Sequence, residues 1–143
     1  MKLQLWWNRR LARWYHLRGE AYRHLGNTRG DVWEHWAAVE DFTRAVALDP
    51  TLGQAYLDRG ILYWRELHEP QKAVADLTAA LSVDPRLYEA LFNRGVAYQQ
   101  LGDIVAALTD FRAYLSVGAH PYWREYAERM IAELTVEPDK EEP

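Results

Sequence analysis

The sequence predicts an all-α protein built from three stacked helical hairpins and a closing helix. The pattern Arg-Gly-x-x-Tyr occurs three times, and its glycines, Gly19, Gly60 and Gly95, are 41 and 35 residues apart. Each copy is followed by an acidic residue beside a large apolar one, as in Asp110-Phe111. Repetition near this period is typical of arrays in which each hairpin buries its apolar face against the next one.

The copy over residues 88–117 is the best defined. Its second half carries apolar residues at three- and four-residue spacing, from Ile104 to Phe111, which predicts one buried helix face. Gly102 suits the end of the first helix, and Asp103 can cap the second. A helical hairpin with a tight turn follows from this pattern.

These features together resemble the tetratricopeptide repeat. The resemblance covers residues 12–121, with repeats at about 12–52, 53–87 and 88–121, and Asp-Pro closes the first two copies. It implies a right-handed superhelix whose concave side, lined by the first helix of each hairpin, binds a protein or peptide partner.

A glycine inside a helix costs about 1 kcal/mol relative to alanine, so the three repeated glycines need a compensating contact. We expect this contact between the two helices of each hairpin, with Ala38, Ala73 and Ala107 opposite the glycines. Tyrosines three positions further on are expected to fill the space between hairpins: Tyr22, Tyr63 and Tyr98.

Residues 1–11 precede the repeats as a helical extension, and Leu3, Trp7 and Leu11 share one of its faces. Residues 1–30 contain seven Lys or Arg and a single acid, whereas the remainder has ten bases against twenty acids. One interpretation is that the extension covers the end of the array. The other is a peripheral membrane contact, because Trp and Arg suit the headgroup region. Nucleic-acid binding is not predicted, since the basic patch is short and the rest of the chain is acidic.

The first copy has six to seven more residues than the others between Gly26 and Ala38. Seven residues are close to two helical turns, so we expect a lengthened second helix that begins at Asp31. Two tryptophans of this insertion, Trp33 and Trp36, would project beyond the repeat. The residues considered for membrane or partner contact are therefore Trp6, Trp7, Arg9, Arg10, Trp33 and Trp36.

The third copy ends in Gly-Ala-His-Pro instead of Asp-Pro, which indicates that the next segment packs differently from a fourth repeat. Residues 122–134 have an apolar face and predict a capping helix, because such arrays need a polar outer surface at their ends. Residues 135–143 are acidic with two prolines, and we expect a disordered tail there.

Composition excludes several functions. The chain has no cysteine and therefore no thiol chemistry. No apolar run approaches the ~18 residues of a membrane-spanning helix, and the N-terminus lacks a secretory signal pattern, so we expect a cytoplasmic protein. His16, Glu20 and His24 are four residues apart, but the outer two lie about 12 Å apart on a helix, too far to chelate one ion. No catalytic residues, metal site or cofactor are predicted.

The family resemblance implies which positions of this sequence form the partner-binding surface. Those expected to contact a partner are His16, Glu20, Leu57, Ile61, Trp64, Arg65, Glu89, Phe92, Val96 and Gln99. Family members that bind chaperone tails hold the terminal carboxylate with Lys, Arg and Asn. Here the matching places hold His16, Glu20, Leu57, Ile61, Phe92 and Val96, so the sequence departs from that pattern.

An apolar groove rimmed by charge marks a contact site for an amphipathic helix or an extended apolar segment. The sequence thus predicts a non-catalytic adaptor: a scaffold, assembly factor or accessory subunit of a complex. It leaves open whether the groove faces a partner or is covered by the chain's own C-terminal helix.

Overall fold

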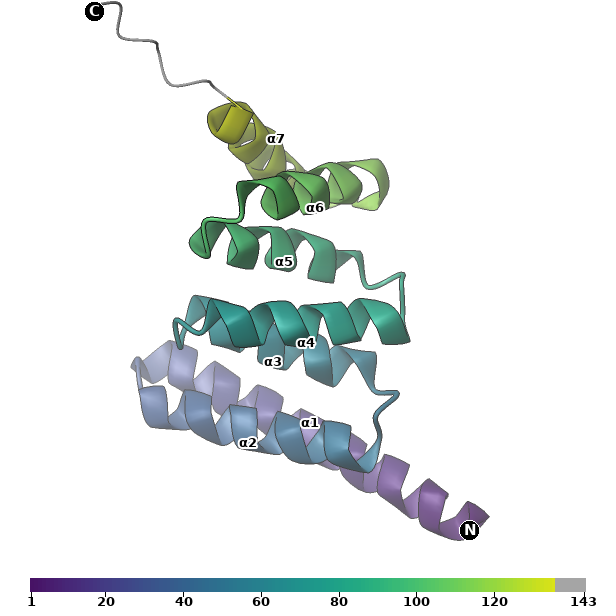
Figure 1. The fold of residues 1–143 in the computed structure, drawn as a ribbon. Helices are drawn as coiled ribbons and strands as arrows, with labels where there is room; N and C mark the ends of the chain where they lie inside the picture. The colour runs from purple at the N-terminus through teal and green to yellow at the C-terminus, as the bar shows by residue number, and fades with distance from the viewer. Residues whose placement is uncertain (136–143) are drawn as a thin grey trace, which may run out of the picture.

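The computed structural model describes residues 1–135, which form helices joined by short turns, with no strand in that range (Figure 1). The helices are α1 (Lys2–Arg29), α2 (Val32–Leu48), α3 (Gly53–Arg65), α4 (Pro70–Val83), α5 (Tyr88–Gln100), α6 (Ile104–Val117) and α7 (Pro121–Thr135). Of the predicted tail, Thr135 is the last residue of α7, and residues 136–143 lie outside the described part.

Consecutive helices pair as antiparallel hairpins, α1 with α2, α3 with α4 and α5 with α6, and the pairs stack in chain order (Figure 1). The last helix, α7, packs against α6 and closes the stack. The prediction of an all-α superhelix of helical hairpins is therefore confirmed. No helix among residues 1–135 combines the length and apolar character needed to cross a membrane.

The arginine of the repeated Arg-Gly pattern holds the two helices of its hairpin together. Arg59 donates from Nε and Nη2 to both carboxylate oxygens of Asp76, each at 2.7 Å. Arg94 bonds Asp110 in the same way, at 2.7 and 2.8 Å. These hydrogen bonds raise the pKa of Arg94 above its ordinary value. The first hairpin repeats the arrangement with Arg18 and Asp41.

The same arginines also connect neighbouring hairpins. Arg59 Nη1 donates to Thr43 Oγ1 of α2 at 2.9 Å, and Arg94 Nη1 donates to Thr78 Oγ1 of α4 at 3.0 Å. Arg59 and Arg94 therefore each tie three helices together, which explains why Arg-Gly and the Asp of the second helix recur as a set.

The glycines of the pattern pack against large side chains. A Cβ at Gly19 would lie 2.7 Å from the Phe42 ring, and one at Gly95 would lie 2.8 Å from the Phe111 ring. A Cβ at Gly60 would lie 2.8 Å from Cγ of Leu77. The atoms nearest these glycines belong to Phe42, Leu77 and Phe111, each four residues beyond the alanine expected to lie opposite. The fully buried ring or leucine of the second helix needs the space that a missing Cβ leaves, and each alanine is buried in the same cluster as that side chain.

We predict that Gly95→Ala lowers the free energy of unfolding by about 1–2 kcal/mol. Displacing the Phe111 ring should cost about 1–3 kcal/mol, and the better helix propensity of alanine returns up to about 1 kcal/mol. Urea denaturation followed by circular dichroism measures the difference. An unchanged or higher stability would show that the glycine only weakens its helix.

The extra residues of the first repeat lengthen both of its helices. Helix α2 has 17 residues against 14 in α4 and α6, and α1 also continues to Arg29 before Gly30 turns the chain at φ 67°. Asp31 caps α2 as predicted, since its carboxylate accepts from Trp33 N at 2.9 Å. Both inserted tryptophans are exposed: Trp33 and Trp36.

Candidate functional site

A pocket of about 240 Å³ lies between α3, α5 and α7. Six of the ten predicted contact residues line it: Ile61, Trp64, Arg65, Glu89, Phe92 and Val96. Sequence reasoning missed the other four lining residues, Asn93, Tyr122, Trp123 and Tyr126, three of which come from α7. The closing helix is thus one wall of the pocket.

Aromatic packing from α7 covers the floor of this pocket. Phe92 is only 6% exposed because Trp123 stacks on it at 5.4 Å and Tyr126 meets it edge-on at 5.3 Å, both between ring centroids. Val96 is buried beside it, and Leu57 is buried between α3, α4 and α5. These three predicted contact residues are almost fully buried. Phe92 and Val96 form the floor, and Leu57 belongs to the core.

Hydrogen bonds fix the central tryptophan of the pocket. Trp64 Nε1 donates to Asn93 Oδ1 at 3.1 Å, and Asn93 Nδ2 donates to the backbone oxygen of Glu89 at 2.8 Å. Asn93 is buried, so this bond satisfies a polar group that would be costly to leave unpaired. The indole is therefore held in one orientation before any ligand arrives.

Charges of opposite sign line the same pocket. Glu89 is partly buried, and burial followed by the nearby Asp58 carboxylate raises its pKa. Arg65 is exposed and contacts Glu66 at 3.3 Å. A ligand that neutralises Glu89 would relieve the cost of burying this carboxylate.

A second pocket of about 290 Å³ adjoins the first, since Ile61 and Arg65 line both. Its remaining lining residues are Arg23, His24, Asn27, Leu62 and Glu66. The two pockets form a groove that runs from α1 across α3 to α5 and α7. We call it the concave groove.

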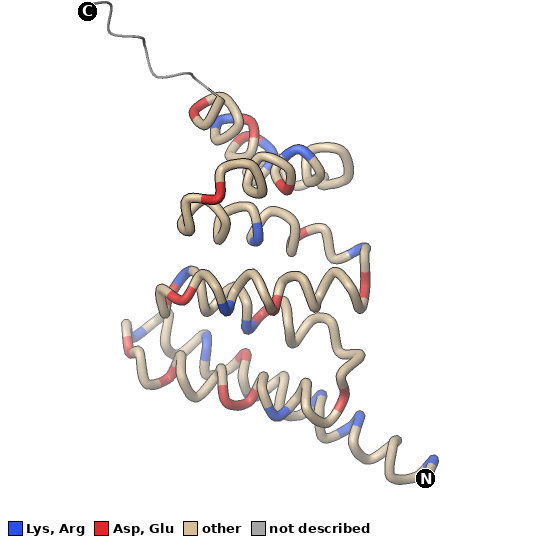
Figure 2. Tube along the Cα trace, in the orientation of Figure 1, with Lys and Arg blue, Asp and Glu red and all other residues tan. Residues whose placement is uncertain are grey.

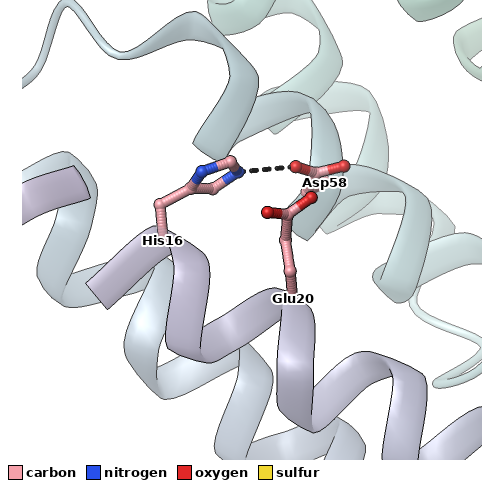
Figure 3. A group of neighbouring side chains, drawn as sticks. All are labelled: His16, Glu20 and Asp58. Atoms are coloured by element: carbon pink, nitrogen blue, oxygen red, sulfur yellow. Dashed lines mark hydrogen bonds and ion pairs between the residues drawn. The ribbon is translucent and has the colours of Figure 1, made fainter. Parts of the chain in front are cut away.

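His16, Glu20 and Asp58 come together at the α1–α3 contact, with their ligand-type atoms within 4.8 Å of one another (Figure 3). His16 Nε2 lies 2.7 Å from Asp58 Oδ2, and Arg23 Nη1 donates to Asp58 Oδ1 at 3.1 Å. Because a guanidinium already neutralises the buried carboxylate, the group acts as a polar link between helices. His16 points to Asp58, and neither His16 nor Glu20 lines either pocket.

The sequence does contain a signal for Asn93, the polar lining residue that the prediction missed, and for the equivalent Asp58. The position just before each Arg-Gly holds Leu17, Asp58 and Asn93. The two polar ones are almost fully buried, and both bond to groove residues. Gln99, in contrast, donates to Met130 Sδ at 3.3 Å and supports α7 outside both pockets.

The tryptophans grouped for membrane or partner contact occupy two separate places. Trp6 and Trp7 lie at the free end of α1, whereas Trp33 and Trp36 lie at the α1–α2 turn (Figure 1). About 23 residues of helix separate these places, roughly 35 Å. They are two sites, not one surface.

Residues 88–117 match the sequence model of the family described as tetratricopeptide repeat. No curated protein matches the chain. The similar solved structures include the first TPR of Spaghetti (RPAP3) bound to the HSP90 peptide SRMEEVD, with TM-score 0.77, 19% identity, and coverage of 90% of this chain and 98% of that one.

Two further structures show the same fold. The Arabidopsis OM64 TPR domain gives TM-score 0.75 and 25% identity over 88% of this chain and 98% of its own. The Yersinia enterocolitica type III secretion chaperone SycD was solved in complex with a peptide of the translocator YopD. It gives TM-score 0.67 and 15% identity over 80% of this chain and 90% of its own. Fold and repeats define a helical-repeat protein of the all-α class. Residues 88–117 match the tetratricopeptide-repeat model, and the described residues have the fold of tetratricopeptide-repeat domains.

Proposed function

We propose that the protein is a non-catalytic interaction module that holds a segment of a partner protein in the concave groove. The observation that carries this proposal is the pocket between α3, α5 and α7, which combines aromatic walls with a charged residue of each sign. Such a module serves as a scaffold, an assembly factor or an accessory subunit of a complex.

Relatives of the same fold support segment binding. The Spaghetti domain was solved with an HSP90 peptide and the Yersinia chaperone with a YopD peptide. The pocket volume of about 240 Å³ is below the about 300–1,000 Å³ usual for small-molecule sites. It suits one large side chain of a bound segment better than a whole cofactor.

The lining residues define the chemistry of the segment. Trp64 and Tyr126 favour an apolar or aromatic anchor, on an amphipathic helix or an extended strand. Glu89 disfavours an acidic group there, because its carboxylate is already poorly solvated. The partner segment is thus apolar at its anchor and not acidic beside it.

Selection of peptides from a random displayed library on the full-length chain tests the proposal. We expect enriched peptides to lose at least tenfold in affinity with Tyr122→Ala, since this side chain is an exposed aromatic residue of the pocket. Fluorescence polarisation of a labelled peptide measures the loss.

The matched control is Tyr88→Ala, an exposed tyrosine at the start of α5 that does not line the pocket. It should leave the affinity within about twofold. Peptides that bind all variants equally would place the binding surface elsewhere.

A further inference from the structure

We propose that the free end of α1 docks the protein onto an anionic membrane surface, independently of the concave groove. The contact surface is a set of apolar residues that we call the N-terminal stripe. Its members are Leu3, Trp6, Trp7, Leu11, Trp14 and Leu17.

The beginning of α1 extends past the body of the protein (Figure 1). The first buried residue of the helix is Ala12, and the residues before it are exposed, apart from a half-buried Asn8. These residues span about 15 Å of helix. The packed part of α1 keeps this end helical, since a helix extends more easily than it nucleates.

The N-terminal stripe lies away from the packed side of α1. Ala12, Gly19 and Gly26 recur every seven residues and are buried in the first hairpin. Leu3 and Trp14 lie about 180° and 200° around the helix from Ala12. All six stripe residues are exposed, with fractions between 44% and 69%. Single exposed apolar residues are common, but a contiguous row marks an interaction surface.

The basic residues around the N-terminal stripe favour an anionic binding partner. Residues 1–17 carry Lys2, Arg9, Arg10 and Arg13 and no acid, and Figure 2 shows basic positions along the projecting part of α1. One of these cations, Arg10, lies over a stripe ring, with its guanidinium carbon 4.7 Å from the centroid of the Trp6 ring. Indole rings at the acyl boundary with guanidiniums at the phosphates are the arrangement that interfacial helices use.

The rest of the chain restricts the contact to this end. Residues 31–143 contain ten bases against twenty acids, so a negative membrane repels them. A second copy of this chain is disfavoured as the partner, because the Lys and Arg of its own α1 would face and repel those of the first copy. Trp33 lies at the far end of α1 and is outside the contact.

Co-sedimentation of the full-length protein with vesicles tests the proposal. We expect binding to phosphatidylcholine–phosphatidylserine vesicles and little binding to pure phosphatidylcholine vesicles. Arg9→Gln with Arg13→Gln should weaken partition roughly twenty- to thirty-fold, about fivefold for each cation. Trp7→Glu should weaken it at least tenfold.

Trp33→Glu is the matched control, because it places the same charge on an exposed tryptophan outside the stripe. All changed residues are exposed, so circular dichroism should show folded protein in each case. Equal sedimentation with both vesicle types would overturn the requirement for an anionic surface. No sedimentation with either would overturn membrane docking and leave an acidic protein as the stripe's partner. An equal loss with Trp33→Glu would overturn the proposal as well.

Discussion

Replacing Arg94 with alanine is expected to lower the free energy of unfolding by about 3–5 kcal/mol. Asp110 is almost fully buried, and both of its carboxylate oxygens accept from this one guanidinium. Without Arg94 the carboxylate would stay buried and uncompensated. Thr78 would also lose its link to the next hairpin. Urea denaturation followed by circular dichroism measures the loss.

The exposed pair of Arg86 and Asp84 provides the control, since the Arg86 side chain is 82% exposed. Arg86→Ala should leave the free energy of unfolding nearly unchanged, because water screens an exposed ion pair. The double variant Arg94→Met with Asp110→Leu should recover most of the stability, because it removes both buried charges. A loss for Arg94→Ala no larger than that for Arg86→Ala would contradict the structural role of the pair.

These pairs also show what the sequence could predict. The repeated Arg-Gly and the repeated Asp of the second helix were both visible as patterns, and the hairpins followed from them. Their pairing was not visible, because it depends on how the two helices of a hairpin are aligned in space. The same limit led to Ala38 in place of Phe42 as the neighbour of Gly19.

Part of the candidate site followed from the sequence, and part did not. Repeat positions identified Ile61, Trp64 and Glu89, which do line the pocket. Periodicity shows that Phe92 is apolar but not which element covers it. The break before Pro121 indicated that the next helix packs differently, but the direction in which α7 crosses is set by long-range contacts of Trp123 and Tyr126.

Phe92→Ala is expected to lower the free energy of unfolding by about 3–5 kcal/mol. Phe92 contacts the rings of Phe111, Tyr114, Trp123 and Tyr126, so its removal opens a cavity between the third hairpin and α7. Phe92→Leu keeps most of the volume and should cost less than about 1.5 kcal/mol.

Hydrogen exchange of Phe92→Ala should show that most of the lost stability is at the C-terminal end of the described residues, in α7. Each unit of a repeat array contacts its neighbours only, so the amides of α7 should lose protection while those of α2 keep theirs. Because Trp123 and Tyr126 also form a pocket wall, the same variant should lose peptide affinity under conditions in which α3 remains folded. Unchanged protection of α7 would mean that this helix is held by contacts other than the Phe92 ring.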